Sequence, residues 1–392
     1  MPVRRRGLTG VAAGVAMAVV AGAFAAPALA GEYGEYGEYG ERHRATREAM
    51  EAALNADAPG VTVQARDRHG DKHGEWNAAA GIGDLERQSP RGAHDRYRVG
   101  SVTKTFVSTV LLQLVAEKEL RLDDTVGRWL PGVVEGHGHD GDKITVRRLL
   151  NHTSGVFDVA RDPGFREKVF SEKFLAHRYD TWTPAQQVAV AMGNEPHFKP
   201  GKGWKYSNTN YLLAAMIIEK VTGETYADAI ERRIIEPLGL SATSLPGTDP
   251  RMPAPASRAY MKLSGAPDAK THDVTELNPS VAGPAGEMIS SSADLNRFYS
   301  ALLRGEILPG KQLAEMKRTV LKDKSDPRER YGLGLESRRT PCGTVVWGHD
   351  GDIHGSSSEV VGTEDGRHML ALNFNGPEGD RAAVIDAEFC GK

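Results

Sequence analysis

Strand-like segments near both ends of the chain, separated by a long helical middle, constrain its fold most. On the N-terminal side, "GVTVQARD" (60–67) and "GEWNAAAGIG" (74–83) flank a turn-forming stretch, which predicts a β-hairpin. Near the C-terminus, three further runs are strand-like, "YGLGLES" (331–337), "GTVVWGH" (343–349) and "GRHMLALNFN" (366–375). We therefore expect an α/β fold of the α+β type, with one antiparallel sheet built from residues 46–100 and 285–392 and a large, mostly helical insertion over 101–284.

The first 30 residues have the pattern of a secretory signal peptide. Arg4–Arg6 form a basic start, an apolar run follows, and "APALA" ends in the small residues that precede cleavage, here after Ala30. The alternative is an uncleaved membrane anchor, because the apolar run is nearly long enough to span a bilayer. The repeat "GEYGEYGEYG" has too little apolar content to fold, so we expect a flexible leader over 31–45 and a single domain over 46–392.

Charge and cysteine content narrow the function classes. Cleavage would remove three arginines and no acids, which moves the formal net charge from −3 to −6 and leaves no basic footprint for nucleic acid. Cys342 and Cys390 are the only two cysteines. In an exported protein such a pair predicts a disulfide, and the alternative is two separate buried thiols.

The segment "SVTK" places Ser101 and Lys104 three residues apart at the start of an apolar helix. Residues at this spacing share one helix face. A lysine acts as a base for a serine hydroxyl only where burial or a neighbouring cation lowers its pKa, and a buried helix offers that environment. The pattern alone is weak, because S-x-x-K occurs about once by chance in a chain of this length.

Two further short patterns carry polar groups that suit acyl-transfer chemistry. "YSN" supplies Tyr206, which could pass on the serine proton, and Asn208, which could orient a substrate amide. The alternative for this pattern is a helix N-cap beside an ordinary packed tyrosine. "HDG" supplies His349 as a cationic or hydrogen-bonding group, although a histidine at a strand end is more often structural.

In this order, S-x-x-K, Y-x-N and [K/H]-x-G resemble the active-site motifs of penicillin-recognising serine hydrolases. The chain resembles in particular the secreted D-Ala-D-Ala carboxypeptidase and class C β-lactamase branch, over about residues 46–392. Further similar stretches are "LLNHTSGV" (149–156), "EPLGL" (236–240) and "AGEMISSSADLNRF" (285–298). The resemblance implies a β-lactamase/DD-peptidase-like fold, and no G-x-S-x-G motif surrounds Ser101 to suggest an α/β-hydrolase instead.

The resemblance also implies roles for these residues. Ser101 would be the acylated nucleophile, Lys104 and Tyr206 would share the general-base work, and Asn208 would contact the substrate amide. His349 would stand where many relatives have lysine. The backbone N–H groups of Ser101 and Asp352 would form the oxyanion hole, often the largest catalytic contribution.

The chain departs from the family where relatives hold a substrate carboxylate with hydroxyl groups and an arginine. Acids flank Gly351 here, Asp350 and Asp352, and Glu336 occupies the arginine position. A carboxylate ~5 Å from one ionised acid is repelled by roughly 3 kcal/mol at an effective dielectric constant near 20. We therefore expect an acidic substrate subsite suited to a cation, an amide or an ester, unless the acids are protonated, face outward or pair with arginines of the insertion. Strand alternation places His349 on the opposite face from the two aspartates.

These features predict a secreted, monomeric serine hydrolase that needs no cofactor and cleaves D-amino-acid peptides of the peptidoglycan type as a peptidase or amidase. A D-Ala-D-Ala carboxypeptidase proper, an esterase and a β-lactamase are alternatives on the same scaffold. A further alternative, from another class, is a non-catalytic sensor of wall fragments. β-Lactams are expected as covalent ligands. His137, His139 and Asp140 offer metal ligands, but their glycine-spaced loop favours a solvated turn, so no metal site is predicted.

Overall fold

A single antiparallel sheet organises the computed structural model, which describes residues 42–69, 72–266, 268–377 and 379–391. The sheet has nine strands in the order β10-β11-β12-β13-β14-β15-β1-β2-β3. Its strands are β1 (Gly60–His69), β2 (Lys72–Asp84), β3 (Ser89–Pro90), β10 (Val320–Leu321), β11 (Glu329–Tyr331), β12 (Glu336–Arg339), β13 (Val345–Ile353), β14 (Ser356–Thr363) and β15 (His368–Phe374). All neighbouring pairs are antiparallel.

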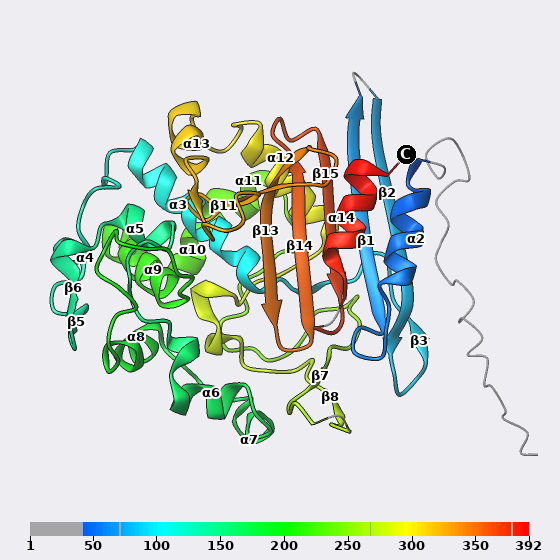
Figure 1. Cartoon of the computed structure of the whole chain (residues 1–392), viewed down its shortest axis with the longest axis horizontal. Helices are drawn as coiled ribbons and strands as arrows, with labels where there is room; N and C mark the ends of the chain where they lie inside the picture. Colours follow the sequence, from blue (N-terminus) through cyan, green and yellow to red (C-terminus); the bar gives the residue numbers. More distant parts are fainter. Residues whose placement is uncertain (1–41, 70–71, 267, 378, 392) are drawn as a thin grey trace, which may run out of the picture.

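The two ends of the chain meet in the middle of this sheet (Figure 1). β1 pairs with β15 from Val61 opposite Phe374 to Asp67 opposite His368, and it pairs with β2 on its other edge. The expected hairpin and the expected sheet from both termini are therefore confirmed.

The C-terminal half of the sheet differs from the expectation in three places. Residues 331–337 do not form one strand, because Gly332–Leu335 turn the chain between β11 and β12. The run "SSSEVVGT" forms a full strand, β14, that the sequence analysis did not predict. β13 continues past His349 to Ile353, so the "HDGD" motif lies inside a strand rather than at its end.

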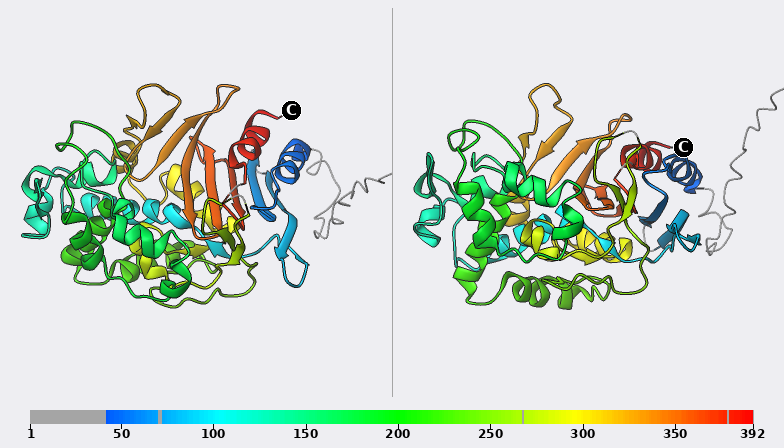
Figure 2. Two further views of the ribbon diagram at one scale, coloured as in Figure 1. Left: turned by 60° about the horizontal axis from the view of Figure 1, so that its bottom comes forward. Right: turned by 90° about the horizontal axis from the view of Figure 1, so that it is seen from below.

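Helices cover both faces of the sheet (Figure 2). On one face α2 (Arg44–Ala52) and α14 (Arg381–Cys390) pack against each other and against the sheet. Their apolar side chains form a core with the strands that includes Met50, Val63, Phe374 and Val384. On the other face α12 (Ser292–Leu303) lies across β1, β14 and β15.

The mostly helical part lies beside this second face and is built around α3 (Thr103–Ala116) and α9 (Thr209–Thr222), which pack together. Both helices are apolar on nearly every side and are buried, as the sequence of α3 predicts. Around them lie α4 (Val126–Trp129), α5 (Val146–Leu150), α6 (Pro163–Val169), α7 (Phe174–His177), α8 (Pro184–Met192), α10 (Tyr226–Ile230), α11 (Glu236–Leu238) and α13 (Gly310–Met316). Two-stranded ribbons join β4 (Tyr97–Arg98) to β9 (Ile289–Ser290), β5 (Glu135–Gly136) to β6 (His139–Asp140), and β7 (Tyr260–Lys262) to β8 (Thr271–Asp273).

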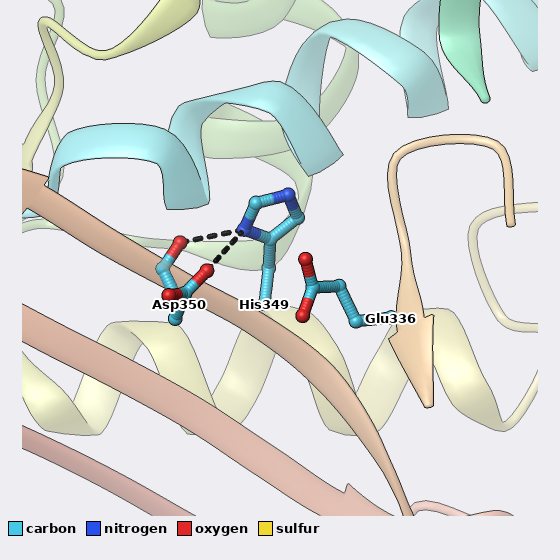
Figure 3. Close-up of side chains that lie close together, drawn as sticks. All are labelled: Glu336, His349 and Asp350. Carbon is cyan, nitrogen blue, oxygen red and sulfur yellow. Dashed lines mark hydrogen bonds and ion pairs between the residues drawn. The ribbon is translucent and has the colours of Figure 1, made fainter. Parts of the chain in front are cut away.

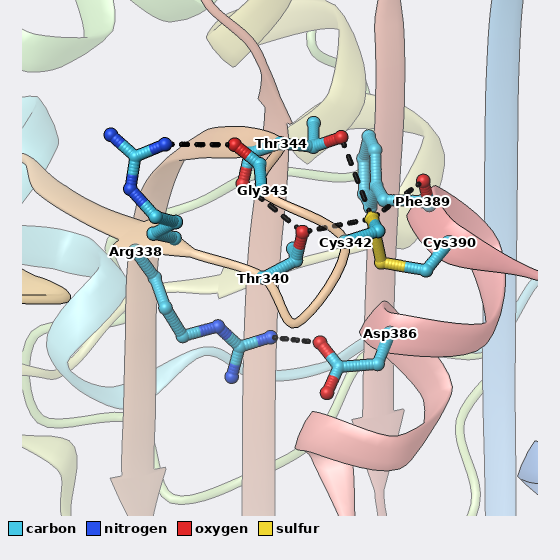
Figure 4. The surroundings of a disulfide bond; sticks show 9 residues. Arg338, Thr340, Cys342, Gly343, Thr344, Asp386, Phe389 and Cys390 are labelled. Atoms are coloured by element: carbon cyan, nitrogen blue, oxygen red, sulfur yellow. Dashed lines mark hydrogen bonds and ion pairs between the residues drawn. A yellow bond between two sulfur atoms is a disulfide. The ribbon is translucent and has the colours of Figure 1, made fainter.

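A disulfide links Cys342, in the β12–β13 turn, to Cys390 at the end of α14 (Figure 4). This confirms the predicted pairing and rules out two separate thiols. An ion pair between Arg338 and Asp386 lies beside it, with 3.7 Å between Nη2 and Oδ1. The expected signal peptide and most of the leader fall outside the described residues, and within the described part no helix is long and apolar enough to cross a membrane.

Candidate active site

Ser101 lies in a single 3-10 turn, Gly100–Val102, that leads directly into α3. The turn packs against β13 so closely that both contact points must be glycine. A Cβ on Gly100 would lie 2.7 Å from the backbone nitrogen of Asp352, and Gly100 also has a φ of +54°. A Cβ on Gly351 would lie 2.0 Å from the carbonyl oxygen of Val99. The glycine of "HDGD" therefore allows β13 to bring the backbone of Asp352 beside the serine.

Lys104 is fully buried one helical turn after Ser101. Its Nζ lies 2.9 Å from Ser101 Oγ, 2.9 Å from Asn208 Oδ1 and 2.6 Å from the carbonyl oxygen of Ala285. A charged ammonium donates to all three oxygens. A neutral amine has only two N–H groups, which match the amide and carbonyl oxygens, and its lone pair then faces the serine hydroxyl.

The environment of Lys104 favours the neutral form. Burial lowers its pKa from 10.5 to about 7, although the carboxylates of Asp158, Asp350 and Glu336 oppose this shift. A substantial fraction of Lys104 is therefore uncharged near neutral pH. The burial that the sequence indicated is what makes the amine available as a base.

Tyr206 lies next to the lysine, with Lys104 Nζ 4.8 Å from its ring centroid. Burial raises the pKa of Tyr206 well above 10, and Ser101 lowers it by a smaller amount. The phenol oxygen is buried and makes no hydrogen bond of ordinary geometry, so its approach to Ser101 is loosely aligned. Its ring stacks on His152, with 4.2 Å between centroids. Tyr206 is thus a neutral phenol that can pass a proton but does not rest as a phenolate.

Asn208 is occupied within the protein. Its Oδ1 accepts from Lys104, and its backbone N and Nδ2 donate to Asp158 Oδ1 at 3.0 and 3.2 Å. Asn208 precedes α9 as its N-cap residue, yet its side chain makes no capping bond. The simple capping alternative is therefore wrong, and the amide orients Lys104 before any substrate arrives.

His349 is buried and neutral. Burial lowers its pKa to about 4, its Nδ1 lies 2.5 Å from the carbonyl oxygen of Asp350, and its Nε2 lies 2.8 Å from the Tyr331 hydroxyl. Because a carbonyl can only accept, Nδ1 carries the proton and Nε2 accepts from Tyr331. Of the two roles expected from the sequence, cationic or hydrogen-bonding, the structure favours the hydrogen-bonding one for His349 at neutral pH.

The acids near His349 are paired with cations. Glu336 and Asp350 lie on either side of the His349 ring (Figure 3), and these three residues line a hollow of about 320 Å³. Arg381, from α14, pairs with Asp352 at 2.9 Å and with Asp350 at 3.4 Å, and Lys322 pairs with Glu336 at 3.0 Å. Burial also raises the pKa of Glu336 to about 8. The aspartates do pair with an arginine, but it comes from the last helix rather than from the insertion. Nor does alternation keep His349 and Asp350 apart, because a carboxylate oxygen of Asp350 lies 3.6 Å from His349 Nδ1.

Glu336, His349 and Asp350 bring potential metal ligands within 4.8 Å of one another. Both ring nitrogens of His349 already have partners, and so does Glu336, so the protein itself holds this group together. In the loop that contains His137, His139 and Asp140, Asp140 pairs with Lys143 and His139 contacts the carbonyl oxygen of Asn194. Two of these three potential metal ligands thus have partners within the protein.

A largely apolar pocket of about 100 Å³ opens at Ser101, and Asn208 and the backbone around Asp352 also line it. Its walls include Val159, Phe165, Val169, Phe170, Val281 and Ile353. His354 supports one wall, because its ring stacks on Phe174 at 4.0 Å and on Phe170 at 5.5 Å, and its Nε2 lies 2.6 Å from the carbonyl oxygen of Val169. The second histidine of "HDGDIHG" is thus a structural part of the pocket.

Sequence reasoning missed several residues that complete the site. Asp158, His152 and Tyr331 contact residues that were predicted, and Lys322 and Arg381 form ion pairs with predicted acids. His152 lies within "LLNHTSGV", and Asp158 follows two residues after that stretch. Their position in or beside a motif of the family could therefore have indicated both residues. Lys322 and Arg381 lie in segments with no motif.

Comparison with known proteins agrees with this geometry. A D-stereospecific amidohydrolase from Streptomyces sp. is 56% identical, superposes with a TM-score of 0.84, and the match covers 89% of this chain and 99% of that one. A D-amino acid amidase from Ochrobactrum anthropi SV3 is 28% identical with a TM-score of 0.74, over 89% and 95% of the two chains. A penicillin-binding protein of Bacillus subtilis (strain 168) is 27% identical over 312 residues, which is 77% of this chain but only 66% of that relative's length.

The family model described as Beta-lactamase matches residues 47–389, almost the whole of the described chain. The serine hydrolase motifs, the sheet topology and the amidohydrolase neighbours agree with this match. The chain therefore belongs to the Beta-lactamase family and is one of its serine hydrolases.

Proposed function

We propose that this protein is a secreted amidase or peptidase that cleaves amide bonds after apolar D-amino acids through an acyl-enzyme on Ser101. The observation that carries the proposal is the buried Lys104, whose Nζ lies 2.9 Å from Ser101 Oγ at the mouth of an apolar pocket. Similarity to two D-specific amidohydrolases supports the choice of substrate class.

The proposed reaction begins with neutral Lys104. Its two N–H groups donate to Asn208 and Ala285, and its lone pair accepts the proton of Ser101 as Oγ attacks the substrate carbonyl carbon. The proton then moves to the leaving nitrogen, and Tyr206 is placed to relay it because its phenol stays protonated. Water then takes the place of the amine: it gives a proton to the same relay as it attacks the acyl carbon, the bond from that carbon to Ser101 Oγ breaks, and Oγ takes the proton back.

The backbone N–H groups of Ser101 and Asp352 are the proposed oxyanion hole. The close packing of Gly100 on β13 supports this assignment, since it brings the nitrogen of Asp352 beside the Ser101 turn. Main-chain donors fixed by a helix start and a strand need little reorganisation when charge develops on the substrate oxygen.

The apolar pocket is the proposed binding site for the side chain of the acylating D-residue. Phe170 lies at its rim and is 42% exposed, so it can contact an aromatic or aliphatic side chain. Phe170→Ala should raise KM for D-phenylalanine amide about tenfold or more and should change KM for D-alanine amide much less. Tyr179→Ala is the matched control, because Tyr179 is an exposed aromatic outside the pocket lining.

On the leaving-group side, the structure argues against recognition of a free carboxylate. Lys322, Arg338 and Arg381 are the cations that line the hollow beside His349, and each is already paired with a carboxylate of the protein. A substrate carboxylate would have to displace these partners, whereas an amide or ester carries no charge to balance.

The deciding experiment compares kcat/KM for one apolar D-dipeptide as its free acid and as its C-terminal amide, with the L-isomers alongside. We expect the D-amide to be preferred over the D-acid by at least tenfold. Asp350→Asn with Asp352→Asn removes two of the carboxylates paired with Arg381, although Glu359 stays at 3.6 Å, and should narrow that ratio, whereas the exposed Asp365→Asn should not. A wild-type preference for the free acid would identify a D-Ala-D-Ala carboxypeptidase proper, and hydrolysis of β-lactams alone would identify a β-lactamase.

Secretion is part of the proposal. The disulfide between Cys342 and Cys390 supports an oxidising compartment. The mass of the protein recovered from culture medium should match a chain that begins at Gly31. A full-length mass in the membrane fraction would instead indicate the uncleaved anchor.

A further inference from the structure

His152 contacts each of three consecutive residues centred on Tyr206. Its carbonyl oxygen accepts from the backbone nitrogen of Lys205 at 3.1 Å, and its Nδ1 accepts from the backbone nitrogen of Ser207 at 3.1 Å. Its ring stacks on the Tyr206 ring itself, with 4.2 Å between the centroids and 28° between the planes. One residue therefore holds the main chain on both sides of Tyr206 and the tyrosine ring as well.

The imidazole ring of His152 is fixed in one tautomer. It is fully buried, and Asn210 Nδ2 lies 3.1 Å from the same Nδ1 that accepts from Ser207. A backbone N–H and a side-chain NH₂ can only donate, so Nδ1 is an acceptor and the ring proton is on Nε2. Burial lowers the pKa of His152 well below 6.5, and the charge of Lys104 adds to this shift, so the ring is neutral at neutral pH.

The backbone at this position would favour a different residue. His152 follows α5 and its C-cap residue, Asn151, and has a φ of +60°. Just after a helix this left-handed conformation is usually adopted by glycine and sometimes by asparagine, and it is strained in most other residues. The end of α5 therefore does not account for a histidine, whereas the contacts of the ring with the Tyr206 segment do.

Tyr206 needs this support because its hydroxyl group does not anchor it. The phenol oxygen is buried, and among the described residues it has no hydrogen-bond partner of ordinary geometry. The tyrosine is placed through its ring instead, by the stacked His152 and by Tyr331, which meets the Tyr206 ring edge-on at 6.2 Å. His152 also meets the Tyr331 ring edge-on at 4.7 Å, and the Tyr331 hydroxyl is bonded to His349. The ring of His152 thus lies between the two tyrosines of the site.

We propose that His152 is a positioning residue, whose neutral ring holds the Tyr206 phenol where it can pass a proton from Lys104 to the leaving nitrogen. This inference rests on the proposed function. As the bond from the acyl carbon to that nitrogen breaks, the phenol gives its proton to the nitrogen and takes one from Lys104. His152 does not line the pocket at Ser101 and exchanges no proton itself. A phenol that is free to shift should lose much of this transfer, because the relay requires hydrogen-bond distance to both groups.

The variant His152→Asn tests this role with little disturbance of the fold. Asparagine suits the left-handed conformation, and its Oδ1 can accept from Ser207, but no ring remains to stack on Tyr206. We expect kcat/KM for D-phenylalanine p-nitroanilide, whose leaving nitrogen needs a proton, to fall about thirtyfold. For the D-phenylalanine p-nitrophenyl ester, whose leaving group departs as a phenolate, kcat/KM should fall by less than about threefold.

The matched control is His43→Asn. His43 is also a buried histidine whose ring stacks on an aromatic side chain, that of Trp76 at 4.8 Å, but it lies beside α2 on the opposite face of the sheet. Its replacement should leave kcat/KM for both substrates unchanged.

A double-mutant cycle with Tyr206→Phe separates positioning from general damage to the fold. If His152 acts through the Tyr206 hydroxyl, adding His152→Asn to Tyr206→Phe should lower kcat/KM for the anilide by less than about threefold more. Losses that multiply, or equal losses for the anilide and the ester in His152→Asn, would overturn the proposal. If His152→Asn does not fold, Asn210→Ala replaces it, because it removes one of the two donors that fix the ring, and the same comparison of substrates applies.

The cycle also distinguishes this inference from the proposed function. An anilide rate that Tyr206→Phe leaves unchanged would refute the relay, and the positioning role with it. A loss in Tyr206→Phe without one in His152→Asn would overturn the positioning role alone.

Discussion

The protonation of Lys104 gives the most direct test of the proposed chemistry. Its pKa falls from 10.5 to about 7 because the side chain is buried, and a shift of that size corresponds to about 5 kcal/mol of preference for the neutral amine. If the neutral amine takes the serine proton, kcat/KM must follow its fraction. The rate should be level above pH 8 and should fall about tenfold for each pH unit well below 7. The substrate should be an ester without ionisable groups, so that only the enzyme titrates.

The titration of Lys104 must be distinguished from that of other ionisable groups in the site. Burial lowers the pKa of His349 to about 4 and that of His152 well below 6.5. Neither histidine therefore causes the fall of kcat/KM near pH 7, which we call the acidic limb of the pH profile. Burial raises the pKa of Glu336 to about 8 and that of Glu359 to about 7, so both could contribute. If the acidic limb belongs to Lys104, it should persist in both Glu336→Gln and Glu359→Gln, and in Glu336→Gln it should move to lower pH because the Glu336 charge raises the Lys104 pKa.

The variant Asp158→Asn then tests whether the acidic limb belongs to Lys104. Asp158 is the largest opposing influence on the Lys104 pKa, so removing its charge while keeping its shape should lower that pKa by about one unit. The acidic limb should move to lower pH by the same amount, and the exposed Glu364→Gln should leave it in place. A limb that stays in place in Asp158→Asn, or a rate independent of pH between 5 and 9, would refute Lys104 as the base.

Four further outcomes follow from the site and its support. Ser101→Ala should abolish both turnover and covalent labelling by a fluorescent penicillin, and residual label in the mass spectrum would place the nucleophile elsewhere. Tyr206→Phe should lower kcat about a hundredfold or more with little change in KM, whereas an unchanged kcat would exclude a relay role. Replacing Cys342 and Cys390 together by serine should lower the free energy of unfolding by about 2–4 kcal/mol in chemical denaturation and leave kcat unchanged. Arg381→Gln should move the acidic limb of kcat/KM to higher pH, and a shift to lower pH would contradict its proposed electrostatic role.

Much of the fold was predictable because it is set by local hydrophobic pattern. The hairpin of β1 and β2, the buried α3 and the pairing of both chain ends in one sheet all follow from runs of apolar residues in the sequence. β14 was missed because its sequence, "SSSEVVGT", has three serines at one end. Those serines are buried against polar partners, Arg98 and Asn373 among them, and such long-range contacts leave no periodic signal.

The sequence predicted residues that the structure brings together in the candidate site, but it did not predict their charge states. Short motifs identified Ser101, Lys104 and Tyr206, since the family chemistry requires these residue types at these positions. The state of His349 depends instead on Tyr331 and on a main-chain carbonyl, and neither contact is encoded near the motif. The arginine that pairs with the aspartates could not be predicted, because Arg381 lies 29 residues beyond Asp352 in a helix that packs on the far face of the sheet.

The ion pairs on that far face explain how acids and a neutral lysine can coexist in one site. The charges of Asp350 and Glu336 both act to raise the pKa of Lys104 and so to keep it protonated. Arg381 and Lys322 offset those charges directly, and burial further raises the pKa of Glu336, which reduces its negative charge. Cations from α14 and from the segment after α13 thus accompany the acids that the resemblance places where relatives have hydroxyl groups. Under the proposed function, the paired cations that allow Lys104 to remain a base are the ones a substrate carboxylate would need, so the preference for an amide substrate and the low pKa of the base would share one cause.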